Sequence, residues 1–263
     1  RSAITCGSAK LALVISVPAS IASALSAGAR RGLLMKGGAV IEAAARTTQV
    51  AFDKTGTLTL GRPRITDIVP ISGSQAEVLS LAAGIEAGSS HPLAEAILSR
   101  AESDGVAPLP ASGARALPGK GAEAMVSGVP AWVGSPRFAE ASGVFDDAAR
   151  RTAAALEDAG KTVVAVFRAD RLVGLLALRD EPRPDAGDAV RQLKALGVGA
   201  VMLTGDNART AAAISQALGM EHRAELMPED KVAAIREMVV HGRVMMVGDG
   251  INDAPALASA HVG

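Results

Sequence analysis

The residues of this sequence that could do chemistry begin with Asp53, which comes directly after a short apolar segment. Residues 49–52 read Gln-Val-Ala-Phe, as expected of a buried strand, and a lysine, a glycine and three threonines follow the aspartate. A carboxylate at the end of a buried parallel strand, beside a lysine and the donors of a tight turn, is suited to nucleophilic attack on phosphorus. The simpler alternative is that Asp53 only caps the turn.

Three further motifs end apolar segments or open a helix. Thr204-Gly205-Asp206 follows residues 198–203, Asp249-Gly250 follows residues 244–247, and Lys231 lies in the first turn of a helix that Pro228 begins. In a parallel sheet, the turns that follow the strands share one edge, where ligands bind. We expect Asp249 to join Asp53 on a Mg²⁺ ion, which prefers hard oxygen ligands, and Lys231 and Thr204 to contact phosphate.

Together these motifs resemble those of P-type ATPases, which have the haloacid dehalogenase-like fold. The run Asp53-Lys54-Thr55-Gly56-Thr57-Leu58-Thr59 is similar to the phosphorylation signature of that family. The resemblance implies that Asp53 takes the γ-phosphate of ATP, with ATP and Mg²⁺ as cofactors. It implies a catalytic set of Asp53, Lys54, Thr55, Thr204, Gly205, Asp206, Lys231, Asn252 and Asp253, and the Mg²⁺ ligands Asp53, Thr55 and Asp249.

Position 55 separates two activities of this fold. Phosphatases of the fold usually place a second aspartate two residues after the nucleophile as general acid and base, and Thr55 stands at that place here. Without that base, water should attack an aspartyl phosphate slowly. A persistent phosphorylated intermediate suits a pump, so Thr55 argues against a stand-alone phosphatase.

Residues 63–178 change in character and predict a separate α+β insert. Ser74-Gln75-Ala76-Glu77 is a capping box that opens a helix, and His91-Pro92 opens a second one. Ser127-Gly128 and the turn around Asp170 each separate two apolar segments, which is typical of antiparallel hairpins. Helices beside hairpins within one stretch indicate α+β architecture.

Five residues of the insert resemble the nucleotide site of the metal-transporting branch of the family. Glu86 lies five residues before His91, and glycines stand at positions 119, 121 and 134. The resemblance implies that Glu86 and His91 reach the adenine, while Gly119, Gly121 and Gly134 let the backbone approach the nucleotide. Taken alone, a histidine before a proline is more often a helix cap.

Residues 11–29 carry no charge and are long enough to span the hydrocarbon core of a bilayer. Arg30, Arg31 and Lys36 follow at once, which places that end in the cytoplasm. This run resembles the fourth-helix exit of heavy-metal-transporting P-type ATPases. The Cys-Pro-Cys-like triplet of that branch is missing, because Ala9-Lys10-Leu11 stands in its place. The alternative is a buried helix of a soluble protein.

Composition argues against several other classes of protein. Lys+Arg and Asp+Glu number 27 each, which argues against a nucleic-acid partner. The single cysteine, Cys6, excludes an internal disulfide framework and a thiolate metal cage. Four Phe, one Trp and no Tyr argue against a base-stacking platform. The sequence starts without Met, and both ends read as cuts through a longer protein.

The sequence therefore predicts an α/β protein with a haloacid dehalogenase-like Rossmannoid parallel sheet and an inserted α+β nucleotide-binding domain. Hydrophobic residues make up 49% of the chain, enough for a sizeable core. The expected parts are a truncated membrane helix over residues 1–29, a phosphorylation domain over 30–62 and 179–263, and a nucleotide-binding domain over 63–178.

The resemblance implies ATP-driven export of a heavy-metal cation, and the sequence around Arg30 and Arg31 favours zinc, cadmium or lead as that cation. The expected partners are ATP, a metal cation bound by membrane helices outside this sequence, and an actuator domain that the sequence lacks. The intact protein would lie in the cell membrane, with the residues from about position 30 onward cytoplasmic. A copper exporter, a stand-alone phosphatase and a non-catalytic nucleotide-binding fragment are the alternatives.

Overall fold

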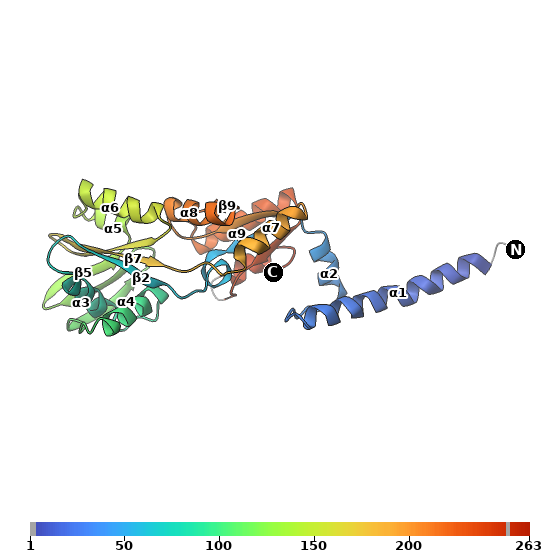
Figure 1. The fold of residues 1–263 in the computed structure, drawn as a ribbon, viewed down its shortest axis with the longest axis horizontal. Coiled ribbons are helices and arrows are strands. Elements are labelled where there is room, and N and C mark those ends of the chain that lie inside the picture. The colour runs from blue at the N-terminus through green and yellow to red at the C-terminus, as the bar shows by residue number, and fades with distance from the viewer. Residues whose placement is uncertain (1–3, 251–252) are drawn as a thin grey trace.

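The computed structural model describes residues 4–250 and 253–263. Two β-sheets organise this part of the chain, one parallel with the strand order β10-β1-β8-β9 and one antiparallel with the order β2-β7-β6-β5-β4-β3. Figure 1 shows the two sheets next to each other along the long axis, with helix α1 extending away from them. We call the two parts the parallel half and the antiparallel half.

The parallel half forms because short apolar segments alternate with amphipathic helices. Residues at even and odd positions of one strand enter different cores: Val201 and Leu203 pack towards α9 and α10, whereas Ala200 and Met202 pack towards α7 and α8. The predicted parallel sheet is thereby confirmed. Its elements are β1 (Gln49–Asp53), α7 (Ala186–Ala195), β8 (Gly199–Leu203), α8 (Ala208–Leu218), β9 (Glu221–Arg223), α9 (Pro228–His241), β10 (Val244–Val247) and α10 (Ala254–Ser259).

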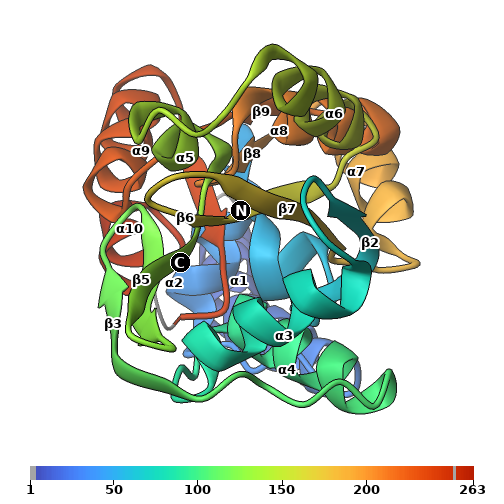
Figure 2. The ribbon, with the colours of Figure 1, turned by 90° about the vertical axis from the view of Figure 1, so that its left-hand side faces the viewer.

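The antiparallel half carries one pair of helices on each face of its sheet (Figure 2). Its strands are β2 (Arg64–Pro70), β3 (Ala111–Leu117), β4 (Gly121–Val126), β5 (Val129–Gly134), β6 (Thr162–Arg168) and β7 (Leu172–Arg179). Helices α3 (Gln75–Glu86) and α4 (Pro92–Ser103) cover one face, and α5 (Pro136–Ala141) and α6 (Asp147–Asp158) cover the other. The predicted insert of helices and hairpins is therefore present.

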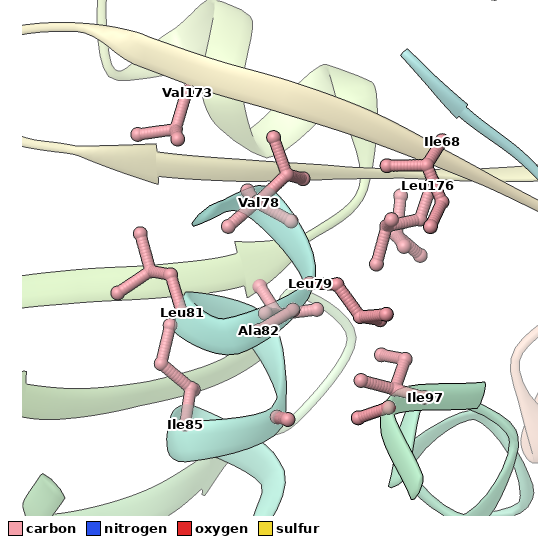
Figure 3. Packing of buried hydrophobic residues seen from close by; sticks show 14 of the residues in the cluster. Ile68, Val78, Leu79, Leu81, Ala82, Ile85, Ile97, Val173 and Leu176 are labelled. Carbon is pink, nitrogen blue, oxygen red and sulfur yellow. The ribbon is translucent and has the colours of Figure 1, made fainter. Parts of the chain in front are cut away.

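Helix α3 shows how local signals and packing agree in the antiparallel half. Ser74 Oγ accepts a hydrogen bond from Glu77 N, and Ser74 N donates one to Glu77 Oε2, so the predicted capping box is confirmed. Val78 and Leu79 are almost fully buried, and Figure 3 shows Val78 against the strands of the sheet and Leu79 on the side of Ile97 of α4. This packing fixes the end of α3, where Glu86 lies.

The chain passes between the halves through two neighbouring segments, and Asp180 joins them. Its Oδ2 accepts hydrogen bonds from Thr59 Oγ1 at 2.5 Å and from Gly61 N at 3.2 Å, while its Oδ1 accepts one from Arg62 N at 3.0 Å. Backbone bonds reinforce this clasp, since Leu60 N donates to Glu181 O at 3.0 Å. The parallel half and the antiparallel half are thus anchored to each other next to the Asp53 strand.

Helix α1 (Ile4–Ala29) and helix α2 (Gly38–Ala45) precede the parallel half. Within the part of the chain that the structure describes, no helix is long and apolar enough to cross a membrane, so the span predicted over residues 11–29 is not found there. Within the predicted span, the side chains of residues 11–15 lie outside those that the structure describes.

Candidate phosphoryl-transfer site

Asp53 ends β1, the strand that lies between β10 and β8 in the parallel sheet. Asp53 as a residue is only 6% exposed, and its Oδ1 accepts a hydrogen bond from Lys231 Nζ at 2.5 Å. Burial raises the pKa of Asp53, and the hydrogen bond and charge of Lys231 offset only part of that rise. The structure therefore places a buried carboxylate at the predicted edge of the sheet, with a cation against one of its oxygens.

Lys231 comes from the first turn of α9 and contacts two carboxylates at once. Its Nζ lies 2.5 Å from Asp53 Oδ1 and 2.9 Å from Asp253 Oδ1, and Asp253 is only 2% exposed. Burial on its own lowers the pKa of Lys231, but Asp53 and Asp253 outweigh that effect and raise it. Lys231 is therefore charged and can balance negative charge at this edge.

A second ion pair joins the Asp53 loop to the loop after β8. Lys54 Nζ lies 2.5 Å from Asp206 Oδ2, and both side chains are largely buried. The contact is a charge pair without the alignment of a hydrogen bond, since Asp206 Oδ2 accepts none among the described residues. Thr204 Oγ1 accepts a hydrogen bond from Asp206 N at 3.1 Å, which fixes the turn between them.

The loop after Asp53 is a tight turn, η1 (Lys54–Leu58), and glycine is needed within it. Gly56 has φ +76°, in the left-handed region, and a Cβ atom at this position would lie 3.4 Å from Asp249 Oδ2. The carboxylate of Asp249, which follows β10, thus lies against the turn. The side chain of Thr55 is exposed at the same place.

The charges at this edge fit a divalent cation. Four carboxylates gather at this edge, those of Asp53, Asp206, Asp249 and Asp253. Lys54 pairs with Asp206, and Lys231 pairs with Asp53 and Asp253. No group of three or more His, Cys, Asp or Glu side chains forms a preformed metal cage within that part of the chain. Mg²⁺ needs no such cage, because one or two carboxylates together with phosphate and water suffice for it.

The other predicted residues of this site are placed as follows. Gly205 lies between Thr204 and Asp206, where a Cβ atom would approach Leu226 O to 3.2 Å. Asn252, which the sequence analysis also assigned to the site, lies outside the described residues. The structure thus brings together every other predicted catalytic residue, from four separate segments of the chain.

The predicted nucleotide residues Glu86 and His91 lie at the corner between α3 and α4. Glu86 is 6% exposed, and burial raises the pKa of its carboxyl group, while a hydrogen bond with Ser89 lowers it. His91 Nδ1 accepts a hydrogen bond from Leu93 N at 3.2 Å and so caps α4. The capping role raised as the simpler alternative is therefore present, and it leaves the other ring nitrogen of His91 for a ligand.

The three predicted glycines lie along and beside the β4–β5 pair. Gly121 is paired with Gly134, and a Cβ atom on Gly134 would lie 2.6 Å from Lys120 O. Both positions therefore need glycine for close packing of the two backbones. Gly119 has φ +70°, and a Cβ atom there would lie 3.9 Å from Met227 Cε of the parallel half. The glycines have a structural reason that does not depend on any ligand.

Comparison with known proteins decides the family. The family model of haloacid dehalogenase-like hydrolases matches residues 48–261, which is most of the chain. This chain belongs to the haloacid dehalogenase-like hydrolases.

Its relatives within the haloacid dehalogenase-like family include metal-transporting P-type ATPases. The zinc/cadmium/lead-transporting P-type ATPase of Escherichia coli (strain K12) is 51% identical over 256 residues, with 96% of this chain and 34% of the relative covered. A crystal structure of a zinc-transporting PIB-type ATPase in the E2.Pi state matches with a TM-score of 0.69 at 51% identity, covering 96% of this chain and 41% of that one.

The catalytic domain of the CPx-ATPase CopB-B, described for its conformational changes upon nucleotide binding, is also similar to this haloacid dehalogenase-like chain. It has a TM-score of 0.67 at 29% identity, and the match covers 90% of this chain and 88% of that one. In contrast, this chain spans about a third of the length of the Escherichia coli relative.

The glycine pair of this haloacid dehalogenase-like chain gives a testable prediction. Gly134→Ala is expected to lower the free energy of unfolding by about 1–3 kcal/mol, because the new methyl group would meet Lys120 O at 2.6 Å and Phe138 at 2.8 Å. Chemical denaturation would measure the change. Gly88→Ala is the matched control, since nothing lies within 4 Å of its added methyl group, and it should stay within about 0.5 kcal/mol. Equal stability of the two variants would contradict the packing argument.

Sequence reasoning missed Asp180 of the clasp. It lies 119 residues from Gly61, to which it bonds, so no local pattern could reveal that contact. The available signal was an aspartate two residues after the apolar segment 172–178 and two residues before Pro182. Asp53 and Asp206 were identified by a similar place after an apolar strand.

Proposed function

We propose that this chain is the ATP-binding and phosphorylated part of a P-type ATPase that exports a heavy-metal cation, with zinc, cadmium or lead as the cargo. The observation that carries the proposal is the buried Asp53 carboxylate at the edge of the parallel sheet, with Lys231 2.5 Å away and Asp249 against the adjoining turn. Identity of 51% with a zinc/cadmium/lead-transporting relative favours that cargo over the copper alternative.

The proposed reaction starts with attack of an Asp53 oxygen on the γ-phosphorus of ATP. A bond forms between that oxygen and phosphorus, the bond to the β–γ bridging oxygen breaks, and ADP leaves with that electron pair. Lys231 holds the carboxylate in place and balances the charge of the incoming phosphate. Thr204, which is buried beside the site, orients the loop that carries Asp206.

Mg²⁺ fits this edge because four carboxylates gather there, as described above. Asp53, Asp249 and the backbone of Thr55 would hold the ion, which supplies charge neutralisation for the phosphate when bound. Thr55 is exposed beside the buried Asp53. The Lys54–Asp206 pair, with its 2.5 Å separation, keeps the two loops around that mouth together.

The two halves take different roles in this proposal. The parallel half, with residues 30–62 and 179–263, is the phosphorylation domain, and the antiparallel half, with residues 63–178, is the nucleotide-binding domain. Residues 1–29 precede the phosphorylation domain, and the residues from about position 30 onward face the cytoplasm in an intact membrane protein. Transport also requires membrane helices that bind the cation and an actuator domain, which other parts of such a protein supply.

The test of the proposed function is phosphorylation of the chain itself. Incubation with γ-labelled ATP and Mg²⁺ should give a phosphoprotein that is stable in acid and labile to hydroxylamine, as an acyl phosphate is. Release of phosphate from small phosphoesters without ATP would instead support the phosphatase alternative. ATP binding without any labelled protein would support the non-catalytic alternative.

His91 gives a prediction about the nucleotide site. His91→Asn is expected to weaken ATP binding about tenfold, because asparagine can still cap α4 but is too short to replace the free ring nitrogen. Titration of the full chain with ATP, followed by nuclear magnetic resonance, would measure it. Thermal melting should show an unchanged midpoint, because the cap is kept. A parallel loss of melting temperature and affinity would assign His91 to the cap alone.

A further inference from the structure

The two halves meet at a second place, remote in sequence from the Asp180 clasp. Helix α6 of the antiparallel half contacts helix α8 of the parallel half, and Figures 1 and 2 both show these helices next to each other. Helix α8 begins directly after the loop that carries Thr204 and Asp206. A contact at this helix can therefore act on the phosphorylation site.

Asn207 makes the central contact and uses both ends of its amide. Its Oδ1 accepts a hydrogen bond from Thr210 N at 2.9 Å and caps α8, while its Nδ2 donates to Glu157 Oε1 of α6 at 2.9 Å. Asn207 is the direct neighbour of Asp206, which pairs with Lys54 in the site. One side chain thus links the start of α8, the Asp206 loop and the other half of the protein.

The residues around this link are buried, and the two halves pack closely there. Thr210 is 1% exposed and donates from Oγ1 to Lys161 O of the antiparallel half at 2.8 Å. A Cβ atom on Gly160 would lie 3.5 Å from Ala213 Cβ, so the backbones approach closely there. The neighbouring pair of Asp158 and Arg209 is more than half exposed and contributes little.

The same arrangement brings the turn at Gly119, which belongs to the predicted nucleotide site, close to the phosphorylation site. The turn at Gly119 approaches Met227 Cε, and Met227 directly precedes the helix that carries Lys231. The α6–α8 contact and this approach are present together. A half held only by a clasp of adjacent segments is free to rotate about it, whereas a second contact removes that freedom.

We propose that Glu157 and Asn207, supported by Thr210 and Lys161, form a latch that holds the antiparallel half over Asp53 and so positions bound nucleotide for phosphoryl transfer. These are positioning residues, which act through the placement of the two halves and do not touch the reacting atoms. The catalytic part of this inference rests on the proposed function. The structural part, that the latch sets how the halves are placed, does not.

The test exchanges donor and acceptor across the latch in the full chain. Asn207→Asp keeps the cap, since aspartate accepts the Thr210 N–H bond as well, but it sets a second carboxylate against Glu157. Glu157→Gln alone keeps an acceptor for the Asn207 amide. The double variant, with both changes, restores one donor and one acceptor with the polarity reversed. If the double variant behaves like the parent, the effect of Asn207→Asp comes from the lost latch contact and not from general damage to the fold.

The first measurement is the distance between the halves, which needs no activity. Spin labels on cysteines introduced at Met125 and Val240, both exposed, would report it in a Cys6→Ser background. We expect one narrow distribution for the parent, for Glu157→Gln and for the double variant, and a broad one for Asn207→Asp. Thr210→Val, which removes the buried hydroxyl and nothing else of size, should also broaden it.

The second measurement is the dependence of phosphorylation rate on ATP concentration. Asn207→Asp should raise the ATP concentration for half-maximal rate about tenfold, with the double variant within about threefold of the parent. Asp158→Asn is the matched control, since it removes a charge from the same contact outside the latch, and it should change either measurement less than about twofold.

The outcomes separate the two claims. A parent-like distance distribution in Asn207→Asp would overturn the latch, whether or not the chain is phosphorylated. Broadening without any change in ATP dependence would overturn the positioning role. An effect of Asp158→Asn as large as that of Asn207→Asp would also overturn the assignment to these residues. A parent chain that is never labelled by ATP would overturn the proposed function, while the distances would still decide the latch.

Discussion

Asp53→Asn is expected to abolish labelling by γ-labelled ATP, with a loss of more than about a thousandfold. The amide keeps the shape of the side chain at the end of β1 but has no anionic oxygen to attack phosphorus. The fold should survive, because burial already disfavours the charged form of Asp53 and raises its pKa. Quantitative autoradiography after an acid quench would measure the label, and a melting curve would confirm the fold.

Asp170→Asn is the matched control for this substitution. Asp170 also pairs with a cation, at 2.9 Å from Arg171 Nη1, but it lies in the turn between β6 and β7 of the antiparallel half. Labelling of this variant should stay within about twofold of the parent, because exposed ion pairs contribute little. Equal labelling of the parent and of Asp53→Asn would remove Asp53 from the role of nucleophile, and the assignment would move to another residue.

Thr55→Asp is expected to shorten the lifetime of the phosphorylated chain by about 10²–10⁴-fold, the usual value of general-base help. The hydroxyl of Thr55 has no useful proton affinity near neutral pH, so it cannot activate water. Its backbone is extended, with φ −75° and ψ 127°, and its side chain is exposed, so aspartate fits without strain. A chase with unlabelled ATP at pH 7 would give the decay rate.

Thr57→Asp is the comparison for this experiment, because it adds the same charge to the same turn at a different place. It should leave the decay rate of any label that forms nearly unchanged. Fast decay in the parent itself would show that another base is at work and would favour the phosphatase alternative over a pump. Equal acceleration by both substitutions would mean that charge, and not position 55, controls hydrolysis.

The edge of the parallel sheet could be predicted from the sequence because each strand was a short apolar segment ended by a polar turn. Asp53, Asp206 and Asp249 were placed together on that ground alone, with no knowledge of their distances. The double contact of Lys231 with Asp53 and Asp253 could not be predicted, since one partner lies 178 residues away and the other 22. Such contacts depend on helix packing, which local patterns do not encode.

Other elements were not predicted from the sequence, for different reasons. Strand β3 is almost wholly exposed along its length, so no alternation of apolar and polar residues indicated it. The amphipathic helix α6 had such a signal and was overlooked, together with α5 and β2. The role of Asn207 was hidden for another reason: its cap on α8 is local, whereas its bond to Glu157 spans 50 residues.

The Asp180 clasp has a consequence for how this chain can fold. The antiparallel half is an insertion between β1 and β8, and the chain leaves and re-enters the parallel half at neighbouring positions. Once Asp180 has bonded to Gly61 and Arg62, the long segment between β1 and β8 is closed off, and the effective contact order of the parallel sheet becomes short. The sheet that carries Asp53 can then assemble as if only a short loop joined β1 to β8, however many residues the insertion contains.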